Sequence, residues 1–227
     1  MQTPTVICAL TIAGSDSGGG AGIQADLKTF AAHRVHGLTA IAALTAQHSR
    51  GVTAVHVPDI GFLRAQLDAC FEDFDIFAVK IGMLASTEVI ECVATMLEAH
   101  RPGHVVLDPV MVATSGAKLL QDDALHALRT RLLPLASIVT PNIPEAELLT
   151  GHAIANADGA VATIAALRAM GARAVLLKGG HLDEGRVVVD RYDDGEVDAE
   201  FIHHRPALEG HGPCCPLASA NPPKLVL

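Results

Sequence analysis

Apolar runs and amphipathic stretches alternate along most of this chain. The apolar run Val6–Ala13 predicts a strand, and Ala21–His33 after it carries apolar residues at helical spacing. Further strands are predicted at Gly37–Ala46, Val52–Val57, Phe77–Ile81, Val105–Leu107, Ser137–Thr140, Ala174–Leu177, Val187–Tyr192 and Phe201–His203. Further helices are predicted at Ile60–Phe71, Ser86–Glu98, Asp122–Leu132, Pro144–Leu149 and Asp158–Met170. This order predicts an α/β fold, with a mostly parallel sheet and helices on both faces.

Polar motifs follow the predicted strands. In open parallel sheets, ligands bind beyond the carboxyl ends of the strands. The sequence therefore predicts a composite small-molecule site at this edge of the sheet. Its motifs are Gly14-Ser15-Asp16, Thr45-Ala46-Gln47, Lys80-Ile81-Gly82-Met83, Asp108-Pro109-Val110-Met111, Thr140-Pro141-Asn142 and Lys178-Gly179-Gly180-His181.

A glycine-rich loop, Gly14–Gly22, lies between the first strand and the first helix. A dinucleotide-binding fold would need an acidic residue at the end of the second strand, where Gln47 stands. The Walker pattern G-x-x-x-x-G-K-[ST] is also absent. Asp16 inside the loop would repel a phosphate but could accept a hydrogen bond from a ring amine or hydroxyl. The loop therefore favours recognition of a ring, with close packing alone as the alternative.

A second group of motifs suits phosphate chemistry. Asp108 ends a strand and could hold Mg²⁺, or it could simply start a turn before Pro109. Lys178, followed by two glycines, could reach triphosphate oxygens. Asn142 and Glu145 have the spacing of a capping box, so a helix cap competes with a ligand role for both.

Charge and hydropathy narrow the function classes. The 227 residues carry a formal net charge of −9, which argues against non-specific binding to nucleic acid or to an acidic membrane surface. No apolar run reaches the roughly 18 residues that a membrane span needs. The N-terminus has no basic, signal-like start, so we expect a cytoplasmic protein.

Taken together, the motifs resemble a known family. The chain is similar to the hydroxymethylpyrimidine/phosphomethylpyrimidine kinases of thiamine biosynthesis, within the ribokinase-like superfamily, from about residue 5 to about residue 212. The resemblance implies a three-layer ribokinase-like fold, use of ATP and Mg²⁺, a small pyrimidine substrate and a homodimer. The matching segments are 11–26, 43–47, 79–84, 107–116, 139–147 and 177–181.

The resemblance also implies roles for individual residues. Substrate contacts fall on Gly14, Asp16, Gln47, Met83 and Val110, with Gln47 reading the edge of the pyrimidine. Asp108 and Glu145 match the Mg²⁺ carboxylates, and Asn142 and Lys178 match contacts to ATP phosphates, Lys178 also serving catalysis. Gly212 matches the phosphate-binding backbone, and Cys215 aligns with the catalytic cysteine.

The chain departs from the family pattern after Gly212. Pro213 and Pro216 stand where the family has threonines, and proline has no N–H to donate to an anion. We interpret residues 1–212 as the kinase domain and 213–227 as an atypical tail, from a truncation, a changed reading frame or divergence. The usual C-terminal helices are expected to be missing and the activity to be impaired.

Several functions stay open at this stage. The leading one is ATP-dependent phosphorylation of 4-amino-5-hydroxymethyl-2-methylpyrimidine and of its monophosphate. A pyridoxal or pyridoxine kinase would share the scaffold, although Gln47 favours the aminopyrimidine. A non-catalytic pyrimidine-binding or regulatory protein is the alternative from another class. A dinucleotide oxidoreductase ranks last, because the acidic ribose-binding residue is missing.

Overall fold

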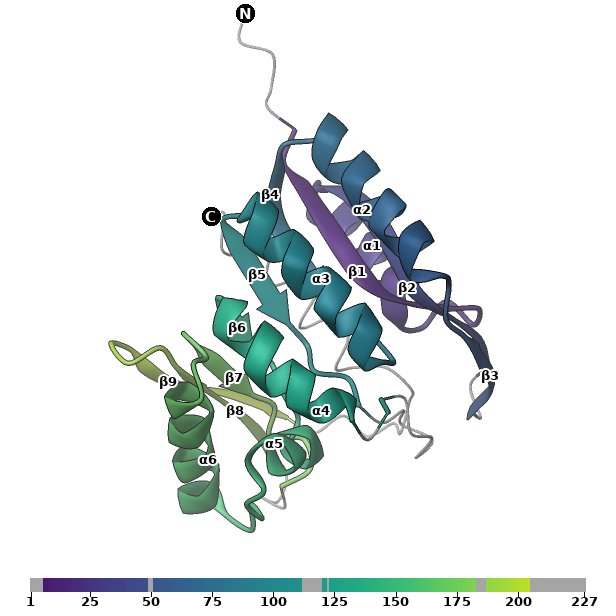
Figure 1. Ribbon diagram of the computed structural model, residues 1–227. Coiled ribbons are helices and arrows are strands. Elements are labelled where there is room, and N and C mark those ends of the chain that lie inside the picture. The colour runs from purple at the N-terminus through teal and green to yellow at the C-terminus, as the bar shows by residue number, and fades with distance from the viewer. Residues whose placement is uncertain (1–5, 49–50, 112–119, 122, 183–186, 205–227) are drawn as a thin grey trace, which may run out of the picture.

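A computed structural model describes residues 6–48, 51–111, 120–121, 123–182 and 187–204. In this part of the chain one nine-stranded sheet has the order β3-β2-β1-β4-β5-β6-β7-β8-β9 (Figure 1). The strands are β1 Cys8–Asp16, β2 His36–His48, β3 Gly51–His56, β4 Ile76–Ile81, β5 His104–Leu107, β6 Ile138–Val139, β7 Val175–Leu177, β8 Val187–Asp193 and β9 Asp198–His204. The helices are α1 Gly22–Ala32, α2 Ile60–Asp73, α3 Thr87–His100, α4 Ala124–Ala127, α5 Ile143–Thr150 and α6 Ala157–Ala169.

The sheet is mostly parallel, as the sequence predicts. The strands from β2 through β1, β4, β5 and β6 to β7 pair in parallel, and β3, β8 and β9 are antiparallel at the two edges. From β1 the chain first turns to β2 on one side and later to β4 on the other. Such a reversal opens a crevice at the carboxyl ends of the neighbouring strands. The fold therefore favours a binding site beyond β1 and β4.

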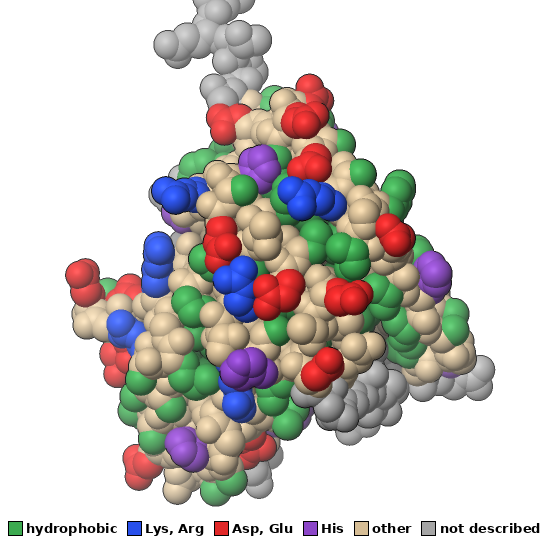
Figure 2. Space-filling view, viewed as in Figure 1, with side chains coloured by type: hydrophobic (Ala, Val, Ile, Leu, Met, Phe, Trp, Pro, Cys, Tyr) green, Lys and Arg blue, Asp and Glu red, His purple; other side chains and the backbone are tan. Residues whose placement is uncertain are grey.

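Helices cover both faces of the sheet, which confirms the predicted layers. In Figure 1, α1 lies behind the sheet, and α2, α3, α4 and α6 lie in front of it. Phe30 of α1 packs on Ala9 behind the sheet. On the other face, Leu67 of α2, Val93 of α3 and Leu167 of α6 share one large apolar core. Figure 2 shows acidic and basic side chains mixed over this face.

Two predicted elements differ from the observed ones. The strand predicted to end at Ala13 continues to Asp16, because Gly14-Ser15-Asp16 pair with β2 beyond a bulge. The segment predicted as a helix over 122–132 is helical from Ala124 to Leu132, but it is not one regular α-helix. α4 spans only Ala124–Ala127 and is followed by a π-helical turn over Leu128–Leu132 and a 3₁₀ turn over Leu133–Leu135. Pro134 cannot donate the hydrogen bond that would continue an α-helix.

The predicted tail, residues 213–227, and the predicted loss of C-terminal helices lie outside the described residues. Within the described ranges, no helix is both long and apolar enough to cross a membrane.

Candidate active site

The carboxylate of Asp16 organises the glycine-rich loop. Its Oδ1 accepts a hydrogen bond from the Gly18 N–H at 2.8 Å. Its Oδ2 accepts from the N–H groups of Gly20 at 2.9 Å and Ala21 at 2.8 Å. Ala21 is the N-cap of α1 and has no side chain that could cap the helix. The buried carboxylate of Asp16 therefore shapes the loop and leads the chain into the helix.

Two of the glycines lie so close to neighbouring atoms that a side chain would not fit there. Gly22 has a φ of 57°, and a Cβ on it would stand 2.2 Å from the Gly14 carbonyl oxygen. A Cβ on Gly14 would stand 2.9 Å from the Met83 Cε atom. The loop is thus folded tightly against the end of β1, and Gly14 faces the segment that follows β4.

The end of β2 is tied to the same loop. The Ser17 hydroxyl donates to the Gln47 carbonyl oxygen and accepts from the Gln47 N–H, both at 2.8 Å. Thr45 Oγ1 lies 3.0 Å from the Ser15 carbonyl oxygen and 3.2 Å from Gln47 Oε1. The pairing of β2 with β3 is also bulged between Ala46 and Gln47. Bulges of this kind re-aim a side chain, here that of Gln47.

Apolar side chains adjoin the loop. Met83 packs with the buried Ala43 and Ala85, and the partly buried Val57 and Val110 pack against them. The structure therefore brings together side chains from the ends of β1, β2, β4 and β5, as the sequence predicts. We call this set the ring cluster; its members are Gly14, Asp16, Gln47, Met83 and Val110. Their contacts with a ligand stay predictions.

A second set of side chains is buried and charged. Lys178 Nζ lies 2.9 Å from Asp108 Oδ1 and 3.9 Å from Glu145 Oε2. All three residues are buried, and the Thr140 hydroxyl donates to Asp108 Oδ1 at 3.4 Å. A backbone bridge between Asn142 and Lys178 brings the ends of β6 and β7 together. We call this set the charged cluster; its members are Asp108, Asn142, Glu145 and Lys178.

When Glu145 is ionised, the charged cluster holds more negative than positive charge. The pKa of Glu145 is raised to about 7, mainly by burial and also by the neighbouring Asp108 carboxylate. Lys178 and the hydrogen bond from the Asn142 N–H act against this shift. The single ammonium group of Lys178 lies close to two buried carboxylates, so a further cation would be stabilised by them.

These carboxylates suit Mg²⁺. The ammonium group of Lys178, close to both carboxylates, shows that a positive charge is favoured at this point. Mg²⁺ is commonly held by one or two carboxylates, with water and substrate phosphates as its other ligands. No group of three or more His, Cys, Asp or Glu within the described ranges could hold a metal ion by itself. Asp108 and Glu145 therefore fit a Mg²⁺ that arrives with phosphate.

Asn142 and Glu145 form a capping box at the start of α5, which confirms the structural alternative for this pair. Asn142 Oδ1 accepts from the Glu145 N–H at 2.9 Å, and Glu145 Oε2 accepts from the Asn142 N–H at 2.8 Å. The cap does not exclude a ligand role. In the described part of the chain Asn142 Nδ2 makes no hydrogen bond, so it can donate one to a ligand.

The two clusters meet at the end of β5. The Val110 N–H donates to the Asp108 carbonyl oxygen at 2.8 Å. Val110 belongs to the ring cluster and Asp108 to the charged cluster, so one tight turn joins them. A ring held by the first cluster would therefore lie beside the charged groups of the second.

Two predicted residues cannot be placed. Gly212 and Cys215 lie outside the described residues. The structure also adds residues that the sequence did not single out. Gln24 accepts from the Asp16 N–H at 2.8 Å and donates to the Ser15 hydroxyl at 2.7 Å, and Ser17 and Thr45 tie the loop to β2. Their hydroxyl and amide groups within or next to the motifs were the available signal.

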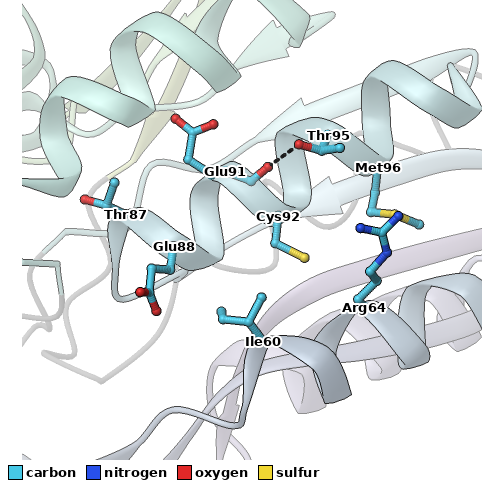
Figure 3. Close-up of a pocket in the computed structure, with 8 residues that line it drawn as sticks. All are labelled: Ile60, Arg64, Thr87, Glu88, Glu91, Cys92, Thr95 and Met96. Carbon is cyan, nitrogen blue, oxygen red and sulfur yellow. Dashed lines mark hydrogen bonds between the residues drawn. The ribbon is translucent and has the colours of Figure 1, made fainter.

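A groove of about 610 Å³ lies elsewhere, between α2 and α3 (Figure 3). It is lined by Ile60, Arg64, Thr87, Glu88, Glu91, Cys92, Thr95 and Met96. None of these residues belongs to either cluster, and Glu91 is paired with Arg131 at 2.8 Å. We therefore place the site at the strand ends, where the chemically suited groups converge.

Comparison with known proteins shows which family the chain is similar to. The family model described as phosphomethylpyrimidine kinase matches residues 16–225. A hydroxymethylpyrimidine/phosphomethylpyrimidine kinase of Rhizobium meliloti is 50% identical over 214 residues, which cover 93% of this chain and 80% of the relative. The crystal structure of a phosphomethylpyrimidine kinase from Clostridium difficile 630 is similar, with a TM-score of 0.86 and 42% identity over 96% of this chain and 90% of that one.

A further solved structure shares the scaffold. The Bacillus subtilis pyridoxal kinase, solved as an ADP complex, is 35% identical with a TM-score of 0.89, over 97% of this chain and 84% of that one. These matches confirm the ribokinase-like fold and the kinase class that the motifs indicate. The chain belongs to the phosphomethylpyrimidine kinase family.

Proposed function

We propose that this chain transfers the γ-phosphoryl group of ATP to the hydroxymethyl group of 4-amino-5-hydroxymethyl-2-methylpyrimidine. It then phosphorylates the monophosphate to the diphosphate, as a step of thiamine biosynthesis. The name of the Rhizobium meliloti relative supports both steps. The observation that carries the proposal is the turn between Asp108 and Val110, which sets a ring cluster beside a charged cluster.

The charged cluster would neutralise the transferring group. Lys178 and Asn142 Nδ2 would donate hydrogen bonds to phosphate oxygens, and Asp108 and Glu145 would hold Mg²⁺ directly or through water. When bound, Mg²⁺ supplies charge neutralisation for the β- and γ-phosphates. Protein assistance to phosphoryl transfer consists mainly of such positioning and electrostatic stabilisation.

The reaction also needs a proton acceptor and an anion site. By its alignment with the family cysteine, Cys215 would take the proton of the substrate hydroxyl. That oxygen would bond to the γ-phosphorus while the bond to the leaving ADP breaks. The Gly212 backbone would donate to the phosphate oxygens.

We further propose that residues 213–227 form an atypical tail that lowers this activity. Pro213 and Pro216 have no backbone N–H, so each would remove a possible donor from the proposed anion site. A variant with Pro213→Thr, Cys214→Gly and Pro216→Thr restores the family pattern and is expected to raise kcat. An unchanged kcat would refute the impairment and leave the kinase proposal standing.

The central experiment measures ADP release from ATP with three acceptors: the pyrimidine, its monophosphate and pyridoxal. We expect turnover with the first two and a lower kcat/KM for pyridoxal. The similarity to Bacillus subtilis pyridoxal kinase favours pyridoxal as the second candidate. Pyrimidine binding in calorimetry without ADP release would instead favour a non-catalytic binding protein.

The assembly and location are proposed from the family resemblance alone. We propose a cytoplasmic homodimer. Light scattering of the purified chain at micromolar concentration is expected to give twice the mass of the monomer, and a monomer mass would refute the dimer.

A further inference from the structure

We infer that Thr45 is a positioning residue that orients the Gln47 carboxamide and so decides which polar ring edge the site accepts. The inference rests on the proposed function, because it concerns the same pyrimidine site. It begins from one hydroxyl group and the two oxygen atoms beside it.

The Thr45 hydroxyl has a single proton to donate. Its Oγ1 lies 3.0 Å from the Ser15 carbonyl oxygen and 3.2 Å from Gln47 Oε1. Both neighbours are acceptors, so the hydroxyl cannot donate fully to the two of them together. One of these two contacts is left without a proton.

A half-turn of the Gln47 amide resolves this competition. The oxygen and nitrogen of a carboxamide are similar in size, so they can exchange places without moving the surrounding atoms. Gln47 Nε2 then donates to Thr45 Oγ1, and Oγ1 donates to the Ser15 carbonyl oxygen. Two hydrogen bonds form where one could form before. A Ser15 backbone oxygen has no such freedom, so the amide is the group that adapts.

The rest of Gln47 is held in place. Its backbone exchanges two hydrogen bonds with the Ser17 hydroxyl, both at 2.8 Å, and it stands at the bulge of β2. Within the described residues, the amide makes no hydrogen bond besides the Thr45 contact. One end of the amide thus faces Thr45, and the other end is available to a ligand.

This arrangement selects a hydrogen-bond donor on the ring. With Nε2 turned to Thr45, Gln47 presents Oε1 to the ligand. Oε1 can accept from an exocyclic amino group, whereas it repels a ring oxygen at the same position. Binding an oxygen-bearing ring requires the amide to turn back and lose one internal hydrogen bond, a difference of about tenfold in affinity.

The test compares two ligands that differ at one ring position. Calorimetry measures the Kd of 4-amino-5-hydroxymethyl-2-methylpyrimidine and of its 4-oxo analogue, without ATP, so that no turnover is needed. For the unaltered chain we expect the amino compound to bind about tenfold more tightly. In Thr45→Val, which has the same shape and no hydroxyl, the ratio is expected to fall toward one. Thr45→Ser keeps the hydroxyl and is expected to keep the ratio.

The ratio separates orientation from general damage, because a loosened site weakens both ligands alike. Thr45→Ala serves as a second variant without the hydroxyl if Thr45→Val does not fold. Tight binding of the amino compound with an unchanged ratio in the hydroxyl-free variant would overturn the inference and leave the proposed function intact. If the unaltered chain binds neither compound, the proposed function itself fails, and the inference with it.

Discussion

The ring cluster and the charged cluster are adjacent, yet they are built in different ways. In the ring cluster, the Asp16 carboxylate is engaged by three backbone N–H groups of its own loop. In the charged cluster, Asp108 and Glu145 share Lys178 and keep excess negative charge. The first site is therefore shaped before a ligand arrives. In the proposed function the second would be completed by cations and phosphate, so we expect it to respond to pH and to ligands far more strongly.

The largest effect is expected from the loss of the central cation. Lys178→Met should lower kcat for ADP release by about 10²–10³-fold, because a preorganised positive charge is removed from the transferring group. Pyrimidine affinity in calorimetry should stay unchanged, since Lys178 lies outside the ring cluster. Arg64→Met on α2 is the control, because it removes an exposed cation of the groove in Figure 3. An equal loss of pyrimidine affinity in Lys178→Met would contradict the separation of the two clusters.

The next effect concerns stability against pH. The pKa of Glu145 is raised to about 7 in the folded chain, above its ordinary value of 4.5. The folded state therefore holds this proton more tightly than the unfolded state does. The full contribution of Glu145 to the free energy of unfolding is present below pH 4.5 and is lost as the pH rises through about 7. The loss is on the order of 3 kcal/mol.

Glu145→Gln should remove this loss while keeping an oxygen for the Asn142 N–H. Urea unfolding at pH 5 and pH 8, without Mg²⁺, gives the change in the free energy of unfolding for each protein. We expect a smaller decrease in the variant than in the unaltered chain. Equal decreases in Glu145→Gln and the unaltered chain would mean that Glu145 does not titrate in this range.

The packing of the glycine-rich loop can be tested with two matched glycine substitutions, one that should disrupt it and one that should not. Gly22→Ala places a Cβ 2.2 Å from the Gly14 carbonyl oxygen at a positive φ, which should displace the loop and weaken pyrimidine binding by about tenfold or more. Gly20→Ala adds the same methyl group, which would meet only Asp16 Oδ2 at 3.8 Å. Calorimetry with the pyrimidine compares the two. Similar affinities would show that the loop does not form the ring site.

The smallest effect is expected from the tie between the loop and β2. Ser17→Ala removes two hydrogen bonds to the Gln47 backbone and should weaken pyrimidine binding by about fivefold. Thr53→Ala is the control, because its hydroxyl also donates to the backbone of β2, at the Ala46 carbonyl oxygen. That variant should bind the pyrimidine as the unaltered chain does. A common loss in both variants would point to general loosening of β2.

Sequence periodicity predicted the layers well because buried parallel strands are short apolar runs. It failed at Gly14-Ser15-Asp16, where polar residues extend β1, because their pairing partners on β2 lie far along the chain. It also did not show that α4 gives way to a π-helical turn at Leu128, because the apolar spacing alone does not distinguish these two helical forms.

The sequence indicated which residues belong to the candidate site better than it indicated which hydrogen bonds and ion pairs they make. Strand-end motifs pointed to Asp108 and Lys178, although 70 positions separate them in the sequence. The sequence could not show that Asp16 is engaged by its own loop, since that depends on the turn that Gly18 and Gly20 make. The capping-box spacing correctly predicted the contact of Asn142 with Glu145.

The central sheet has a weak seam. β1 and β2 pair over nine residues of β1, whereas β6 consists of Ile138 and Val139 and meets β7 through one residue pair and the Asn142–Lys178 bridge. Strands joined by so few hydrogen bonds open locally at a lower free energy than the whole domain. Amide hydrogens along this seam should exchange with solvent sooner than those of β1. A nucleotide bound by the residues at the ends of β5 and β7 would hold these strands together. Binding of the nucleotide at the charged cluster would then slow amide exchange along β6 and β7.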